Sequence, residues 1–356
     1  RRRSNLDILT GVQVTKVLLE GRRAVGVQLH RKGRWQTALA RREVILSAGA
    51  FQSPQLLMLS GIGPAAQLRR HGIDVRVDLP GVGENLQDHL EVIVETRAKS
   101  RVGISFHPLA LPKVIVAFVQ YLFGRRGLFS SNGAEAGGFF KSSPDRPIPD
   151  MQWHFAAFPN TYHGFRLRPM FSGWRYIAFV YALRPHARGR VGLHSADPLA
   201  PPQIDPCYLS DPRDIDELVA GVRRTREVLA QAAFDAHRDV ELSPGADVQS
   251  DEALAAWVRT AAETTYHPAG TCKMGVDPMA VVDPQLRVRG VDSLRVVDAS
   301  IMPTLVGSNT NAPTTMIAEK AADLILAAVS GREQLASADK RLAATMLPAA
   351  AEADAC

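Results

Sequence analysis

The residues best suited to chemistry are a histidine and two asparagines in the last third of the sequence. His267 stands directly before Pro268, and a neutral imidazole takes up protons efficiently near pH 7. Because proline cannot continue a helix, Pro268 is expected to end the preceding helix, which places His267 on a fixed backbone junction. His267 is therefore a candidate general base or, alternatively, a cap for the carbonyl groups at that helix end.

Asn309 and Asn311 precede a helix that is predicted to start near Pro313. Either asparagine can be an ordinary helix cap or turn residue. The functional interpretation is that the start of this helix presents free N–H groups and positive potential to an anion.

The cysteines and the charges exclude several classes of protein. Cys272 is the soft ligand nearest to His267, and no further Cys or His completes a set with metal-site spacing, so no metal is expected. The three widely spaced cysteines favour a reducing compartment, and we expect a cytoplasmic location, either free or peripheral to the inner membrane. The net charge of +6 comes from scattered arginines, which argues against nucleic-acid binding. No apolar run approaches the ~18–20 residues of a membrane span.

Hydrophobic patterning predicts the elements that must position these residues. Short apolar runs separated by turn signals over residues 8–46 indicate an antiparallel set of strands. Ser53 followed by Pro54 and an apolar run is typical of a helix start, and Gly61 is expected at its end. Further strands are predicted near 94–97, 151–158, 174–183, 189–194 and 287–297, helices over 211–232, 251–263 and 313–329, and a loose tail over the last 25 or so residues.

Three longer stretches contain the candidate residues. They are residues 49–63 (GAFQSPQLLMLSGIG), residues 266–275 (YHPAGTCKMG) and residues 296–314, which include VVDASIMP and GSNTNAPT. In content and in order they resemble the signature blocks of the glucose–methanol–choline (GMC) oxidoreductase family, and the resemblance spans roughly residues 5–328. The second stretch looks most like bacterial choline and aliphatic-alcohol dehydrogenases.

The resemblance implies a mixed α/β (α+β) fold with two domains. An incomplete Rossmann-like FAD-binding domain would accompany a substrate domain built on an antiparallel β-sheet with helices. The implied boundaries are residues 1–90 for part of the FAD-binding domain, 91–255 for the substrate-binding domain, 256–330 for the returning FAD-binding segment with the active-site His and Asn, and 331–356 for a tail.

The resemblance also assigns roles to individual residues. His267 matches the family's catalytic histidine, and Asn309 matches its partner in the asparagine form, with Asn311 as the competitor. Glu135 aligns with a glutamate that holds the ammonium group of choline in some relatives. Residues that match cofactor-binding positions are Val14, Ala48, Asp298, Ala299, Thr310 and Asn311.

The implied reaction is FAD-dependent oxidation of a small-molecule alcohol, with the proton going to His267 and the hydride to the flavin. The electron acceptor would be a quinone, another carrier or oxygen. Two alternatives stay open, namely a lyase on the same fold and a truncated, flavin-free fragment without activity. The family's N-terminal Gly-x-Gly-x-x-Gly is absent, because Gly61/Gly63 and Gly81/Gly83 each lack the third glycine. Together with the Arg1 start, this predicts that an N-terminal part is missing and that the chain as given binds FAD poorly.

Overall fold

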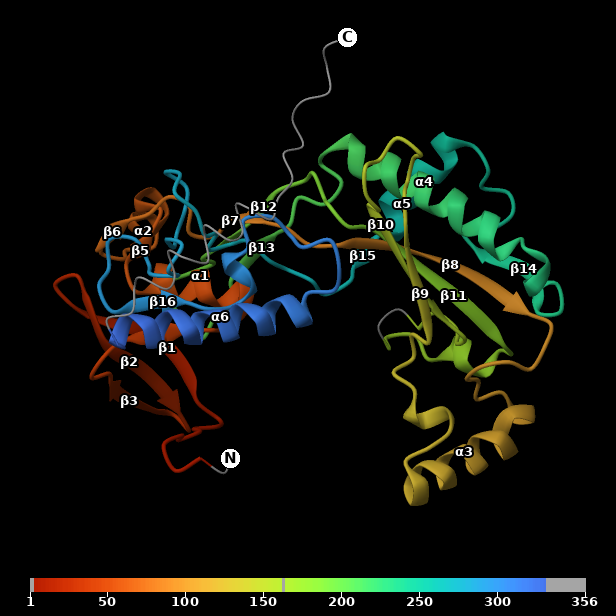
Figure 1. Ribbon diagram of the computed structural model, residues 1–356, viewed down its shortest axis with the longest axis horizontal. Helices are drawn as coiled ribbons and strands as arrows, with labels where there is room; N and C mark the ends of the chain where they lie inside the picture. The colour runs from red at the N-terminus through yellow and green to blue at the C-terminus, as the bar shows by residue number, and fades with distance from the viewer. Residues whose placement is uncertain (1–2, 162–163, 331–356) are drawn as a thin grey trace, which may run out of the picture.

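The computed structural model describes residues 3–161 and 164–330, arranged in two lobes (Figure 1). One hydrophobic core gathers residues from both ends of the chain, such as Val17, Leu57 and Val296. A second core, with Val92 and Val222 among its buried residues, lies entirely within the middle of the chain. Among the described residues, no helix has both the length and the apolar character needed to cross a lipid bilayer.

The first lobe begins with an antiparallel three-stranded sheet. Its strands β1 (Gln13–Glu20), β2 (Arg23–Arg31) and β3 (Arg34–Leu39) are joined by tight turns, as the patterning of residues 8–46 predicts. Gly21 and Gly33 take positive φ in these turns, a conformation that glycine adopts at little cost. β5 (Ile62–Gly63) and β6 (Val77–Asp78) form a short parallel pair beside helix α2 (Ala65–Arg70).

The prediction that residues 44–46 belong to the antiparallel set is wrong. β4 (Val44–Leu46) pairs in parallel with β16 (Leu294–Val296), so that strands from opposite ends of the chain lie side by side. A short apolar run carries no information about a partner so far away in the sequence. The strand predicted over 287–297 is correspondingly shorter, because residues 287–293 form turns and isolated bridges.

Helix α1 (Gly49–Leu59) begins earlier than predicted, at Gly49 and not near Ser53, and Pro54 lies inside it. Proline lacks the N–H that would bond to the carbonyl four residues earlier. That carbonyl, on Ala50, instead accepts a hydrogen bond of 2.6 Å from the buried hydroxyl of Thr271. A side chain from the distant HPAGT segment therefore satisfies the carbonyl that Pro54 leaves without a helical partner.

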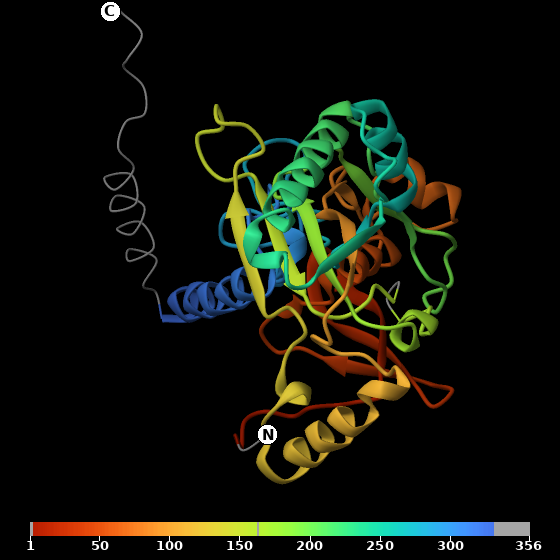
Figure 2. The same cartoon turned by 90° about the vertical axis from the view of Figure 1, so that its right-hand side faces the viewer.

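The second lobe is built on an antiparallel sheet with the strand order β14-β8-β11-β10-β9, and β15 also pairs with β8. Helices α4 (Pro212–Leu229) and α5 (Asp251–Ala261) cover one face of this sheet, and the apolar face of α4 packs on β8 and β11 (Figure 2). The strands are β8 (Leu90–Ala98), β9 (Ala136–Phe140), β10 (Met151–Ala156), β11 (Arg175–Ala182), β14 (Arg238–Ser243) and β15 (Glu263–Thr264).

Two further features connect the lobes. β12 (Gly189–Gly192) pairs with β13 (Gln203–Asp205) and with β7 (Glu84–Leu86). Residues Gln87 and Ala269 exchange backbone hydrogen bonds of 3.0 and 2.9 Å, which ties the segment before β8 to the segment after β15. Helix α6 (Asn311–Ser330) then returns along the first lobe (Figure 1). The tail predicted at the C-terminus lies outside the described residues.

Candidate active site

A cavity of about 400 Å³ lies where β8, β10 and β11 meet the segments around residues 265 and 309. Its polar lining includes His154, His267, Asn309, Glu91 and Glu263, and its apolar lining includes Ile93, Phe158, Ile177 and Phe179. The predicted catalytic pair, His267 and Asn309, therefore lies in one cavity. Asn311 is the exposed first residue of α6 and is not among the lining residues.

The sequence predicted that His267 lies at the end of a helix, and this prediction is wrong. α5 ends at Ala261, and β15 intervenes because residues 263–264 pair with β8. The capping interpretation fails with it, since the ring of His267 contacts side chains and no helix carbonyl. The segment that follows His267, from Pro268 to Gly270, nevertheless packs tightly against the segment around Asn85. Gly270, with φ of +94°, packs so near Asn85 that an added Cβ would lie 2.5 Å from that residue's carbonyl oxygen.

The buried carboxylate of Asp88 fixes the backbone at His267. It accepts a hydrogen bond of 2.9 Å from the backbone N–H of His267 and one of 2.5 Å from the hydroxyl of Tyr208. The hydroxyl of Thr264 donates to it as well. Three donors, two from residues 264–267 and one from Tyr208, converge on one carboxylate, so the turn that carries His267 has little freedom to move.

A chain of hydrogen bonds assigns the protons on the two neighbouring imidazoles. Nε2 of His89 lies 3.1 Å from the carbonyl oxygen of Leu183, which can only accept, so this nitrogen carries a proton. Burial, followed by the nearby His267, lowers the pKa of His89 to about 3, so His89 is neutral and its Nδ1 holds a lone pair. That Nδ1 lies 3.0 Å from Nδ1 of His267, which must therefore be the donor.

Thr265 leads to the same assignment independently. Its hydroxyl donates to the carbonyl oxygen of His89 at 3.0 Å, so its remaining lone pairs face Nδ1 of His267, also at 3.0 Å. Both neighbours of this Nδ1 are acceptors, and the proton of His267 belongs there. Nε2 of His267 is left with a lone pair on the cavity side, and burial, with a smaller contribution from His154, lowers the pKa of His267 below its usual 6.5.

Asn309 is oriented by Gln152 of β10. Nε2 of Gln152 donates to Oδ1 of Asn309 at 3.0 Å, which turns the Nδ2 of Asn309 towards Nε2 of His267 at 3.4 Å. An N–H donor and an imidazole lone pair therefore face the same small volume. An alcohol oxygen placed between them could give its proton to the imidazole and accept a hydrogen bond from the amide.

The acidic groups are arranged differently from the expectation. Glu135 is exposed just before β9 and does not line the cavity, although its neighbours Asn132 and Ala134 do. Glu91 on β8 lines the cavity and is buried, and desolvation together with Glu263 and Asp88 raises its pKa from 4.5 to about 8. Sequence reasoning missed Glu91. The available signal was the polar run Gln87-Asp88-His89 followed by Glu91, at the start of an otherwise apolar strand.

Val14 and Ala48, predicted to bind the cofactor, line one groove of about 590 Å³. This volume lies within the range of small-molecule sites. The groove is bordered by β1, by β4 and by the start of α1, and its apolar wall includes the exposed side chains of Leu39 and Ile45. A groove with apolar walls and a helix start at one end fits part of a dinucleotide.

The other predicted cofactor residues hold the surrounding backbone. Asp298 is buried and accepts hydrogen bonds from the backbone N–H of Gly49 at 2.9 Å, from the hydroxyl of Ser53 at 2.5 Å and from the N–H of Ser300 at 2.8 Å. Its carboxylate thus joins the start of α1 to the 3₁₀ turn Ala299–Ile301. Thr310 and Asn311 lie at the start of α6, where the carbonyl of Thr310 accepts from Thr314.

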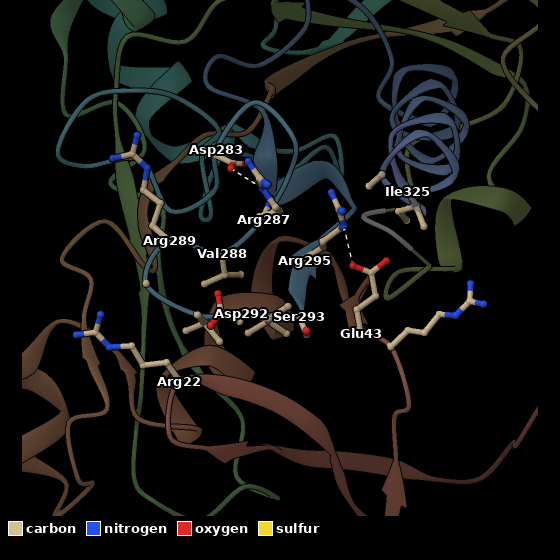
Figure 3. Close-up of a pocket in the computed structure, with 15 residues that line it drawn as sticks. Arg22, Glu43, Asp283, Arg287, Val288, Arg289, Asp292, Ser293, Arg295 and Ile325 are labelled. Carbon is tan, nitrogen blue, oxygen red and sulfur yellow. Dashed lines mark hydrogen bonds and ion pairs between the residues drawn. The ribbon is translucent and has the colours of Figure 1, made fainter. Parts of the chain in front are cut away.

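A third cavity, of about 680 Å³, is lined by five arginines near β16 and the C-terminal half of α6 (Figure 3). Two of them are paired, Arg295 with Glu43 at 2.8 Å and Arg287 with Asp283 at 2.8 Å. It contains none of the residues predicted for catalysis, and it is separate from the cavity around His267.

Within residues 3–161 and 164–330, His186, Asp214 and Glu217 form a group with metal-ligand spacing. The oxygens of this group are already engaged. Asp214 accepts from the backbone N–H groups of His186 and Ala187, and Glu217 pairs with Arg146 at 2.6 Å. Structural hydrogen bonding accounts for these contacts.

The fold is that of a class of FAD-dependent oxidoreductases. Residues 1–91 and residues 185–318 match the N- and C-terminal parts of the GMC oxidoreductase family. The chain belongs to the GMC oxidoreductase family, and the predicted family and mixed α/β fold are confirmed. FAD is the cofactor of this family.

Individual relatives agree with this assignment. An alcohol dehydrogenase [acceptor] of Pseudomonas putida is 49% identical over 326 residues, which cover 91% of this chain and 58% of the relative. An oxygen-dependent choline dehydrogenase of Photobacterium profundum is 44% identical over 327 residues, covering 91% and 57%. The chain thus spans less than three fifths of the length of these curated relatives.

Solved structures resemble the chain as well. A formate oxidase of Aspergillus oryzae, from a study of FAD modification, superposes on this chain with a TM-score of 0.86 at 29% identity. The match covers 92% of this chain and 62% of the formate oxidase chain. A pyridoxine 4-oxidase of Mesorbium loti superposes with a TM-score of 0.76 at 29% identity, covering 91% and 58%.

Proposed function

We propose that this chain carries the catalytic site of an FAD-dependent alcohol oxidoreductase, in which Nε2 of His267 takes the hydroxyl proton of the substrate. The observation that carries the proposal is the hydrogen-bond network from Leu183 through His89 to His267. It leaves a neutral imidazole with its lone pair on the cavity side. A neutral base with a pKa near or below the working pH is ready to accept a proton without first losing one.

Asn309 supports the same step from the other side of the substrate oxygen. Its Nδ2 donates a hydrogen bond to that oxygen, which orients the hydroxyl towards His267 and stabilises the negative charge that develops as the proton leaves. Gln152 and Thr265 act as positioning residues, because each touches Asn309 or His267 and neither is required to exchange a proton.

The cofactor would be held by the groove that Val14 and Ala48 line and by the backbone at Thr310 and Asn311, where the start of α6 offers positive potential to an anionic group. Bound FAD would supply the acceptor for the hydride that leaves the alcohol carbon.

We also propose that the domains divide at residues 90, 255 and 330. A quinone, another carrier or oxygen is the proposed final electron acceptor, and a cytoplasmic or membrane-peripheral location is proposed with it.

The lining of the cavity favours an uncharged alcohol. Ile93, Phe158 and Phe179 give it apolar walls, and Glu91 is protonated at neutral pH because its pKa is raised to about 8. The P. putida relative, whose name is alcohol dehydrogenase [acceptor], points in the same direction.

A quaternary ammonium alcohol is the second candidate, because Glu91 and Glu263 both face the cavity. Binding such a cation would require Glu91 to release its proton. The affinity for a cationic alcohol should therefore rise by up to about tenfold per pH unit as the pH approaches 8, and the affinity for a neutral alcohol of equal size should stay constant. Equal pH dependence for both alcohols would exclude Glu91 as the cation-binding group. The expectation that Glu135 binds the ammonium group is tested in parallel. If it does, Glu135→Gln should weaken the binding of the cationic alcohol far more than that of the neutral one.

The central test is anaerobic stopped-flow absorbance of the flavin-loaded protein mixed with alcohol. His267→Ala should slow flavin reduction by roughly 10²–10⁴ while the cofactor stays bound, and the residual rate should rise with pH as alkoxide replaces the base. Asn309→Ala removes one hydrogen bond and should cost about 1–3 kcal/mol. His194→Ala, at an exposed histidine that does not line the cavity, is the control.

Near wild-type reduction by His267→Ala would remove His267 from the mechanism. Absence of flavin reduction by any alcohol, with substrate cleavage at unchanged flavin absorbance, would favour a lyase on the same fold. If no flavin binds under any condition, the flavin-free fragment without activity is the better account.

A further inference from the structure

Helix α3 (Leu111–Gly124) stands apart from both cores. It projects from the second lobe at the end opposite to α4 and α5, and both views show it at the periphery (Figures 1 and 2). It packs mainly on the two short 3₁₀ turns that flank it, Pro108–Ala110 and Leu128–Ser130. Of its 14 residues, only Ala117 is buried.

The solvent-facing side of α3 is apolar. Leu111, Ile115, Phe118 and Leu122 follow a spacing of three or four residues, which places them on one face of the helix, and all are more than half exposed. Phe123 at the end of the helix is 88% exposed. A surface helix normally turns its apolar face to the core, and here that face points outwards.

The charges around this face have one sign. No Asp or Glu occurs between Thr96 and Ala134, whereas Lys113, Arg125 and Arg126 lie on or directly after the helix. The guanidinium of Arg125 stacks 5.1 Å above the ring of Tyr121. Lys113 and Gln120 are exposed as well and lie on the other side of the exposed helix surface, where a long side chain can extend to water while its stem covers apolar surface.

We infer that α3 docks this protein on the surface of an anionic lipid bilayer, with the apolar face of the helix in the interface and the basic residues at the headgroups. At 14 residues α3 is shorter than the ~20 residues that span a bilayer. An apolar face flanked by Lys and Arg is the composition of helices that lie in the plane of the membrane. Pairing with a second copy is disfavoured, because a two-fold contact would bring the basic residues of both copies together.

The test is sedimentation of the chain with vesicles of phosphatidylglycerol and phosphatidylcholine in equal parts, compared with phosphatidylcholine alone. The chain should bind the anionic vesicles, and salt should weaken the binding. Phe118→Gln/Phe123→Gln should lower the partition coefficient by about tenfold or more. The matched control is Leu199→Gln/Ile204→Gln, two exposed apolar residues on and near β13 and outside α3, which should leave the partition coefficient unchanged.

The basic residues are tested with a second matched pair. Arg125→Gln/Arg126→Gln should lower binding to anionic vesicles by roughly tenfold or more, since each basic residue near such a surface contributes about a fivefold factor. Arg69→Gln/Arg70→Gln, an adjacent exposed pair on α2, should have no effect.

Hydrogen exchange on the unchanged protein gives a readout that does not depend on any variant folding. Anionic vesicles should slow the exchange of amides in residues 111–124 and leave those of α4 unchanged. The inference is overturned if the chain stays in the supernatant, if test and control variants lose binding equally, or if light scattering shows a dimer that the Phe118/Phe123 variant dissociates while vesicles have no effect.

Discussion

Replacing Glu91 by glutamine should stabilise the protein, and the gain should grow with pH. Glu91 is 6% exposed, and desolvation is the largest cause of its raised pKa. Below pH 4.5 the carboxyl is protonated in both the folded and the unfolded chain. Between pH 4.5 and about 8 only the unfolded chain ionises it, so its contribution to stability is lost as the pH rises through this window.

The size of the effect follows from the two pKa values. A rise from 4.5 to about 8 corresponds to at most about 5 kcal/mol above pH 8, and to about 3 kcal/mol at pH 7, at 1.36 kcal/mol per pKa unit. Contact with water in the cavity lowers both figures. Glutamine has nearly the same shape and cannot ionise, so Glu91→Gln should match wild type near pH 4.5 and exceed it by roughly 1–3 kcal/mol at pH 7.

Urea unfolding followed by circular dichroism at several pH values between 4.5 and 8.5 measures the difference directly. The low pKa of His89 changes stability in the opposite direction, but it is common to both proteins and cancels in the comparison. Glu135→Gln, at an exposed carboxyl, should show no pH-dependent gain. If the difference between Glu91→Gln and wild type were constant from pH 5 to 8.5, Glu91 would ionise as an ordinary carboxyl and the reasoning would be refuted.

Three further predictions concern the network, the fold and the cofactor. His89→Phe removes one of the two acceptors that face Nδ1–H of His267 and leaves only Thr265. It should slow alcohol oxidation by roughly 5–30-fold with an altered pH–rate profile, and an unchanged profile would contradict the proton assignment. Thr271→Val leaves the Ala50 carbonyl without a donor and should lower the free energy of unfolding by about 1–3 kcal/mol, whereas a neutral result in urea would argue against this contact. The chain as given, without the glycine fingerprint, should purify with little flavin after release by denaturation, and stoichiometric FAD would count against that expectation.

Much of this protein follows from local patterns in the sequence. The alternation of apolar residues and the glycine turns predict β1–β3, and the apolar periodicity predicts α4 and α6 within two or three residues of their ends. The three motif stretches indicate the family because their residue types and order are specific, and they also point to His267 and Asn309. The start of α1 does not follow from local patterns. Ser53-Pro54 is a good local start signal, but the distant residues Thr271 and Asp298 hydrogen-bond to the first turn that begins at Gly49.

What the tertiary structure alone decided is the environment of each candidate residue. His89 and His267 are 178 positions apart, and no periodicity relates two side chains at that distance. The same is true of Gln152 and Asn309, and of β4 and β16, whose parallel pairing depends on the packing of the whole first lobe. The sequence determined which residue types are available for chemistry, because type and local spacing are written in it. The fold decided which imidazole nitrogen is free and which glutamate is buried, because proton positions and desolvation depend on neighbours brought together from distant segments.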